Sequence, residues 1–243
     1  MLRSLNDLRK FKIRATDGDL GSVDDFYFDD ELWMVRFYVV DTGTWLTGRK
    51  VLISPIASGE ADMREEVIPV DLTMDQVKNS PDVSTEKPVS QQSVAGLYAY
   101  YGWAFPWEGA VYMPPALAAD PSALREPEEP QGDPHLRSAK EVIGYRLEAS
   151  DGEIGHVEDL LMDDEDVRIR YLVVDTKNFL PGRHVLISPD WVSELDYPSR
   201  KAIASVTRRD IESSPEYSPL EPLDRDREAR IFTHYRKRPY WII

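Results

Sequence analysis

The amino-acid sequence repeats itself at a constant offset, and this duplication constrains the fold more than any other feature. The segment Val51-Leu52-Ile53-Ser54-Pro55 recurs intact as residues 185–189, an offset of 134. At the same offset, Asp17-Gly18 recurs as Asp151-Gly152, and close to half of the positions from Leu2 to Pro55 are identical in the two copies. Unrelated sequences of ordinary composition would match at roughly one position in fifteen. The chain is therefore predicted to contain two homologous units.

The duplication also sets the predicted domain boundaries. The offset continues more weakly as far as Trp107, which lies over Trp241, so we expect one unit over residues 1–107 and a second over residues 136–243. Residues 108–135, between the two units, are rich in proline and in acidic residues. Because such a composition buries too little apolar surface to form a core, it predicts a semi-extended linker.

The composition narrows the class of protein and of partner. The 243 residues include 44 acidic and 29 basic residues, which gives a net charge of −15, and no cysteine. The lack of cysteine excludes disulfides, thiolate metal sites and cysteine nucleophiles. The negative charge disfavours nucleic acid and anionic membranes as partners, since both are bound through Lys and Arg. No signal peptide or transmembrane segment is recognisable, so we expect a cytoplasmic protein.

The first part of each unit has the pattern of short β-strands. The Asp-Gly pairs lie between strand-like runs and predict hairpins in which both turn residues have positive φ. Gly21 and Gly155, inside the second strand of each hairpin, predict a bulge or bend. Acidic residues at 29–31 and 163–165 predict solvated turns before a long strand. The alternating apolar residues of that long strand are the predicted core: Val35, Phe37 and Val39 in the first copy, and Ile169, Tyr171 and Val173 in the second.

The second part of each unit predicts short helices. Residues 51–53 form a short strand that Ser-Pro terminates, and residues 66–70 form a further strand. Two pairs have the spacing of helix N-terminal capping pairs: Thr73 with Gln76, and Thr207 with Asp210. Helix-forming sequences also follow Pro88 and Pro222. The predicted fold is mainly β, with two small antiparallel β-barrels, each followed by short helices and an aromatic-rich tail.

These strand segments carry a family resemblance. The run from Asp17 to Asp25, followed by residues 36–55, resembles the PRC-barrel family, which is named after the cytoplasmic domain of the photosynthetic reaction centre H subunit. The C-terminal barrel of ribosome-maturation factor RimM is related to it. The resemblance covers residues 2–81 and 136–215. It implies a tandem of small, mostly antiparallel barrels that serve protein–protein contacts, with no family-wide catalytic residue and without the transmembrane helix of the H subunit.

The acidic turns offer an alternative function as a cation site. Carboxylates of the kind that Ca²⁺ prefers gather in both copies: Asp24, Asp25, Asp29, Asp30 and Glu31 in the first, and Glu158, Asp159, Asp163, Asp164, Glu165 and Asp166 in the second. The calcium-loop spacing is not met, because Ser22 and Phe28 stand where a loop counted from Asp17 requires Gly and Glu. We therefore predict no metal and no cofactor, and we keep a ligand- or metal-responsive regulatory module that uses these turns as the alternative.

Histidine chemistry is not expected. The four histidines have no histidine at the equivalent position of the other copy; His156 lies opposite Ser22, and His184 lies opposite Lys50. Only His156, close in sequence to Glu158 and Asp159, resembles a base with an orienting carboxylate. A surface histidine is the better interpretation, and the chain is predicted not to be an enzyme.

The segment around the loop between the long and the short strand carries the interaction candidates. Polar and aromatic residues recur there in both copies: Arg36, Asp41, Thr42, Trp45 and Arg49 in the first, and Arg170, Asp175, Thr176, Phe179 and Arg183 in the second. In a structural interpretation, Asp-Thr shapes the turn, the aromatic ring covers the end of the barrel, and Arg pairs with Asp. In a functional interpretation they form a contact surface, because a large aromatic residue beside Arg is typical of interface hot spots.

The aromatic tails suggest a second kind of contact. Six aromatic residues between Tyr98 and Trp107 are more than one helical face can bury. We expect them to pack within the chain, and the alternative is that two chains exchange tails to form a homodimer. Together these features predict a non-catalytic interaction or scaffold protein that docks on another protein.

Overall fold

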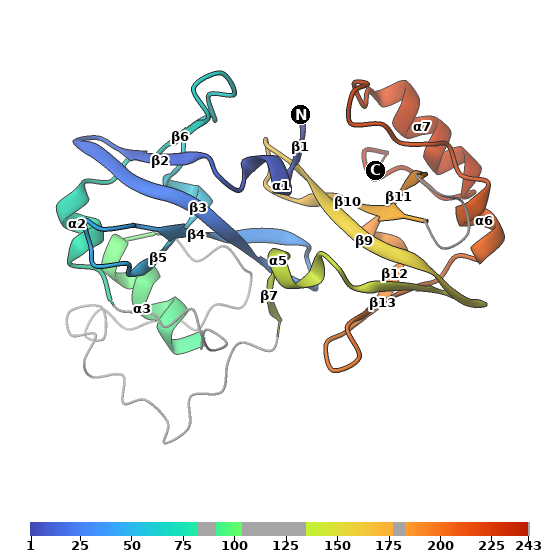
Figure 1. Cartoon of the computed structure of the whole chain (residues 1–243), viewed down its shortest axis with the longest axis horizontal. Coiled ribbons are helices and arrows are strands. Elements are labelled where there is room, and N and C mark those ends of the chain that lie inside the picture. The colour runs from blue at the N-terminus through green and yellow to red at the C-terminus, as the bar shows by residue number, and fades with distance from the viewer. Residues whose placement is uncertain (82–90, 104–134, 177–182, 243) are drawn as a thin grey trace. The chain divides into compact units, whose positions relative to one another are not determined.

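The computed structural model describes residues 1–81, 91–103, 135–176 and 183–242, and its elements divide into two compact units (Figure 1). We call them the C-terminal unit, which comprises Met1–Leu8, Asp30–Val35 and Arg137–Ile243, and the N-terminal unit, which comprises Arg9–Asp29 and Arg36–Leu136. Apart from His135, the predicted linker lies outside the described residues. None of the described helices is long and apolar enough to cross a membrane.

A mixed sheet forms the N-terminal unit, with the strand order β5-β4-β3-β2-β6. The strands are β2 (Lys12–Ala15), β3 (Gly18–Asp29), β4 (Met34–Asp41), β5 (Lys50–Ile53) and β6 (Val67–Pro69). The antiparallel pairs include β2 with β3 and β4 with β5, whereas β6 runs parallel to β2. The helices are the 3-10 helix η1 (Pro55–Ala57), α2 (Met74–Lys78) and α3 (Gln91–Tyr101).

The C-terminal unit has a seven-stranded sheet in which the order β11-β10-β9-β8-β13-β12 is joined by β1, which pairs with β9. The strands are β1 (Leu2–Ser4), β8 (Arg146–Ala149), β9 (Gly152–Asp163), β10 (Ile169–Asp175), β11 (His184–Ile187), β12 (Val192–Asp196) and β13 (Lys201–Ala204). The helices are α1 (Leu5–Leu8), α5 (Ala139–Val142), η3 (Pro189–Trp191), α6 (Arg208–Glu212) and α7 (Arg225–His234). The boundary between the units falls in β7 (Leu136–Ser138).

The sheets differ from the predicted antiparallel barrels. In each unit a late strand returns beside the first hairpin strand and runs parallel to it, β6 beside β2 and β13 beside β8. Parallel neighbours require a long connection, and the strands between β2 and β6 supply it. Over the described residues the strand orders remain open at both ends, so the fold is mainly β but built of two mixed sheets rather than closed barrels.

Each Asp-Gly sequence forms the predicted hairpin, but the turn lies one residue earlier than expected. Ala15 pairs with Gly18, so that Thr16 and Asp17 make the turn, and neither has positive φ. The reason is that the Asp17 carboxylate accepts a hydrogen bond of 2.8 Å from the amide of Met74, at the start of α2. Asp151 accepts the equivalent bond from Arg208 at 2.7 Å. The aspartate therefore ties the hairpin to a helix.

The predicted bulges at Gly21 and Gly155 are confirmed. The register between β2 and β3 shifts at Gly21, and that between β8 and β9 shifts at Gly155. Both glycines have positive φ, 146° and 142°. A Cβ at Gly21 would lie 2.0 Å from the carbonyl oxygen of Asp41, and one at Gly155 would lie 2.2 Å from that of Asp175. Only glycine allows the strands to approach this closely.

The C-terminal unit combines residues of both sequence copies. Leu2–Ser4 forms β1 and pairs antiparallel with Leu161–Asp163 of β9. The starts of the two long strands, β4 and β10, are joined by an antiparallel bridge. The amide of Val35 donates to the carbonyl of Val167 at 2.9 Å, and that of Ile169 donates to the carbonyl of Trp33 at 2.7 Å. Two short segments from the first copy thus complete the fold of the second.

The core of the N-terminal unit lies between the sheet and α3. Phe37, Val39 and Leu52 pack with Val94, Leu97 and Tyr98 of α3. The predicted core residues of both copies are buried. The predicted alternation of buried and exposed residues is not observed in β4, because Tyr38 and Val40 are buried too. The opposite face of β4 is covered as well, with Tyr38 edge-on to Phe26 at 5.7 Å.

Most of the described aromatic residues of both tails pack within their own units, as expected, whereas Tyr100 is exposed. Trp103 contacts Tyr98 edge-on at 5.6 Å and belongs to the periphery of the α3 cluster. In the C-terminal unit, Phe232 of α7 packs against Trp191 at 5.3 Å and against Trp241 at 5.4 Å. Phe105 and Trp107 lie outside the described residues. Exchange of tails between two chains stays a prediction.

Candidate functional site

The recurring Asp-Thr pair shapes the turn after the long strand. In the first copy, the Thr42 hydroxyl donates to the carbonyl of Arg49 at 2.5 Å, and Asp41 accepts the amide of Gly43 at 2.9 Å. In the second copy, the Thr176 hydroxyl donates to the carbonyl of Arg183 at 3.1 Å. Both threonines are buried, and each ties the end of its long strand to the residue that precedes the next short strand.

The recurring arginines after the loop bind backbone carbonyls. Arg49 donates to the carbonyls of Lys78, the last residue of α2, and of Ser80 and Pro81, which follow it, at 2.8–3.2 Å. Arg183 donates in the same way to Ser214, after α6. A guanidinium satisfies several orphaned carbonyls at a helix end at once. These arginines therefore fasten each short helix to the loop of its unit.

The other recurring residues are held within the fold as well. Arg36, 3% exposed, forms an ion pair of 3.2 Å with Asp29. Its counterpart Arg170 pairs with Asp166 and lies 4.2 Å above the ring of Tyr240. The Trp45 indole donates to the carbonyl of Leu20 at 2.5 Å. Phe179 lies outside the described residues. The structure thus places most of the interaction candidates in internal contacts, and a role in binding a partner stays a prediction.

The acidic turns of the C-terminal unit are exposed at Glu31, Asp164 and Glu165, as expected of solvated turns, and they are also ion-paired. Arg3 donates to Asp164 at 2.8 Å, and Arg137, at the equivalent position of the second copy, donates to Asp30 at 2.5 Å. Asp163 is buried beside them. Burial acts to raise the pKa of Asp164, but the hydrogen bonds from the N-terminal ammonium and Arg3 outweigh it and lower that pKa. The turns therefore anchor the N-terminal segment of the chain.

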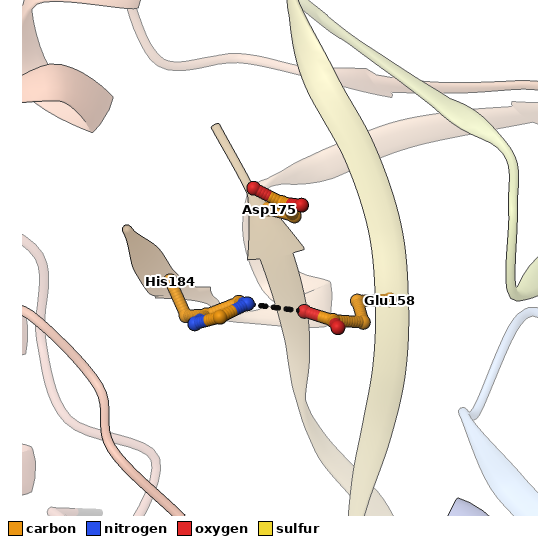
Figure 2. Close-up of side chains that lie close together, drawn as sticks. All are labelled: Glu158, Asp175 and His184. Carbon is orange, nitrogen blue, oxygen red and sulfur yellow. Dashed lines mark ion pairs between the residues drawn. The ribbon is translucent and has the colours of Figure 1, made fainter. Parts of the chain in front are cut away.

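Three adjacent strands bring a histidine and two carboxylates together. Glu158 lies on β9, Asp175 ends β10, and His184 begins β11, where it is the register partner of Asp175. One ligand atom of each lies within 4.8 Å of the other two. Figure 2 shows the His184 ring and the Glu158 carboxylate facing one another, with 2.5 Å between Nε2 and Oε2. Among the described residues, these three side chains are the ones whose ligand atoms lie close enough together to hold a metal ion.

The first copy contains a different version of the same arrangement. At the positions 134 residues earlier stand Asp24, Asp41 and Lys50. The Lys50 ammonium donates to Asp24 at 2.9 Å. This hydrogen bond raises the pKa of Lys50, although burial acts against it, and the charge of Asp41 adds to the increase. The first copy thus holds an ammonium paired with Asp24 where the second holds an imidazole paired with Glu158.

Sequence reasoning associated the wrong histidine with Glu158. His156 is closest in sequence, but it is two residues away on the same strand, and it is His184 on β11 that contacts Glu158. The signal that could have identified the site is the repeat offset, which aligns all three positions with a lysine and two aspartates in the first copy. A separate signal is the antiparallel pairing of β10 with β11 across their connecting segment, which places Asp175 opposite His184.

The C-terminal unit also contains a cavity of about 120 Å³. It is lined by a segment of the first copy and by strands and tail of the second: Glu31, Leu32, Trp33, Arg168, Ile169, Arg170, Ser188, Pro189, Asp190 and Tyr240. Leu32 is 43% exposed at this cavity. The volume lies well below the roughly 300–1,000 Å³ of ordinary small-molecule sites. It is closer to the ~150 Å³ of a cavity that accommodates one benzene ring.

The comparison with known families identifies one domain. Residues 134–210 match the PRC-barrel domain. The second sequence copy contains a PRC-barrel domain. This domain includes β8 to β13 and therefore all three of Glu158, Asp175 and His184, whereas α7 lies after it. No curated protein shows significant similarity to the chain.

Proposed function

We propose that this protein is a non-catalytic interaction module, in which the cavity of the C-terminal unit receives a side chain of a protein partner. The cavity beside Leu32 and Trp33 is the observation that carries the proposal. It has room for a single apolar or aromatic side chain, and it is too small for a cofactor-sized ligand. The PRC-barrel domain that supplies most of its lining agrees with a binding role rather than a catalytic one.

The lining has the chemistry of an interface hot spot. Trp33, Tyr240 and two arginines surround the cavity, and aromatic residues and arginine are the types enriched at the centres of protein interfaces. Arg170 is already held by Asp163 and Asp166. Arg168 uses its backbone in the pairing with Met34, and its guanidinium forms no ion pair with a described residue. We therefore propose a partner segment that presents an apolar side chain next to a carboxylate.

The experiment is site-specific photocrosslinking of the full chain in native cells. A crosslinking residue at Leu32 tests the cavity, and one at Leu220, which is 93% exposed and does not line the cavity, serves as the control. We expect a defined crosslinked protein from position 32 that disappears in Arg168→Glu. Identical products from both positions, or products that Arg168→Glu leaves unchanged, would contradict the proposal.

A further inference from the structure

We propose that Glu158, Asp175 and His184 form a binding site for one divalent transition-metal ion, with Zn²⁺ as the reference cation. The site lies inside the PRC-barrel domain and differs from the cavity near Leu32 in all its residues. It also differs from the acidic turns, whose carboxylates are engaged by Arg3 and Arg137.

The ligand types fit a transition metal. Zinc is bound by histidine nitrogen and by carboxylate oxygen, and zinc sites with three protein ligands keep an open position for water. Imidazole suits zinc, copper, iron and nickel, whereas Mg²⁺ and Ca²⁺ prefer all-oxygen surroundings. The chain has no cysteine, so no thiolate competes for the same ion.

The geometry requires only a small adjustment. Zinc binds nitrogen and carboxylate oxygen at about 2.0–2.2 Å, which places the ligand atoms of a tetrahedral site roughly 3.3 Å apart. The three atoms of this site lie within 4.8 Å of one another, and His184 Nε2 lies 2.5 Å from Glu158 Oε2. Glu158 is exposed and can move by the ~1 Å needed, while buried Asp175 and its register partner His184 are fixed by the sheet.

The first copy supplies an independent argument that this place accepts a cation. There the Lys50 ammonium lies against Asp24, with the charge of Asp41 nearby. The two carboxylate positions are retained in the second copy, but the ammonium is replaced by a ring nitrogen that can be a metal ligand. A metal ion would restore in the second copy the positive charge that lysine provides in the first.

The test is isothermal titration of the untagged full chain with Zn²⁺, accompanied by the visible absorption of bound Co²⁺. The wild-type chain is expected to bind one ion. His184→Lys installs the residue that the first copy already accommodates, and it should weaken binding by more than the roughly 100-fold that loss of an outer-shell partner can cost. His135→Asn removes an imidazole elsewhere and should leave binding unchanged. The circular dichroism spectrum of His184→Lys checks that it folds.

A reciprocal exchange tests the geometry from the other side. Asp24→Glu with Lys50→His gives the first copy the residues of the second and is expected to raise the stoichiometry to two ions. The proposal is overturned if the wild-type chain binds no Zn²⁺, or if folded His184→Lys binds one ion as tightly as the wild type. Either result leaves the proposed contact at Leu32 untouched, because the two sites share no residue.

Discussion

The hydroxyl of Tyr171 donates a hydrogen bond of 2.9 Å to Oε1 of Glu228, which is only 2% exposed inside the C-terminal unit. The Tyr240 hydroxyl donates to the same oxygen at 2.8 Å, and Arg225 donates to Oε2 at 2.9 Å. Burial raises the pKa of Tyr171, and the adjacent carboxylate raises it further, so the phenol remains a donor. The equivalent residues of the first copy are Phe37 and Val94, which are both buried and apolar. At the same junction of sheet and helix, the second copy thus has a hydrogen-bonded polar contact and the first copy an apolar contact.

The first prediction concerns this pair. Tyr171→Phe removes one hydrogen bond to a buried carboxylate, and Glu228→Val leaves the buried Tyr171 hydroxyl and the half-buried Tyr240 hydroxyl without their shared acceptor. Each change should lower the free energy of unfolding by about 1.5–3 kcal/mol. The double variant recreates the apolar pair of the first copy and should cost clearly less than the sum of the two single changes. Urea unfolding of the four proteins measures this, and strict additivity would show that the two residues are not coupled.

The local parts of the fold were predictable because their causes lie close together in the sequence. The Thr73/Gln76 and Thr207/Asp210 capping boxes are both confirmed, as are the bulges at Gly21 and Gly155. The positive-φ hairpin turn was wrong, because Asp17 instead binds the start of α2. That contact is 57 residues away in the chain and no local pattern encodes it.

The non-local parts were not predictable from one sequence. The parallel return of β6 beside β2 depends on the whole path between them, and the pairing of Leu2–Ser4 with β9 crosses more than 150 residues. The candidate metal site depends on strand register as well, since His184 contacts Glu158 only because β9, β10 and β11 are neighbours. The sequence repeat shows which residue types occupy these three positions, but only the strand order of the sheet brings their side chains together.

The second prediction concerns pH. Burial raises the pKa of Asp159, despite hydrogen bonds from Ser4, Leu160 and Asn6 that act in the opposite direction. A carboxyl whose pKa is raised on folding does not lower the free energy of unfolding below its unfolded pKa of about 3.9. It lowers that free energy increasingly as the pH rises through the folded pKa. The stability of Asp159→Asn relative to the wild type should therefore increase between pH 3.5 and pH 7 in urea unfolding.

Asp210 provides the control of opposite sign. The hydrogen bond from the Thr207 hydroxyl lowers the pKa of Asp210, so its contribution is present above the ordinary pKa and is lost as the pH falls through the folded pKa. Asp210→Asn should lose stability relative to the wild type as the pH rises over the same range, by a small amount because the side chain is largely solvated. A parallel response of the two variants would contradict the assignment.

The third prediction concerns close approach of strands. Gly21→Ala and Gly155→Ala each place a Cβ within 2.2 Å of a carbonyl oxygen at a positive φ, so backbone must shift. Each should lower stability by more than ~2 kcal/mol. Gly43→Ala is the matched control, because Gly43 also has positive φ (58°) but no atom within 4 Å of the added Cβ. Its cost should be only the ~1–2 kcal/mol of the left-handed conformation. Equal melting temperatures for Gly21→Ala and Gly43→Ala would show that the carbonyl contact is unimportant.

The last prediction separates a structural role of Arg49 from a role in contacts with a partner. Its guanidinium spans the carbonyls of Lys78, Ser80 and Pro81, which a single ammonium cannot do. Arg49→Met and Arg49→Lys should therefore both lower the free energy of unfolding, by about 1–2 kcal/mol, while a crosslink placed at Thr47 persists. If Arg49 instead serves a partner, the variants will unfold at the wild-type urea concentration and lose a crosslink placed at Thr47, an exposed position of the same loop. Because both readouts use the same variants, the two roles give opposite results in each measurement.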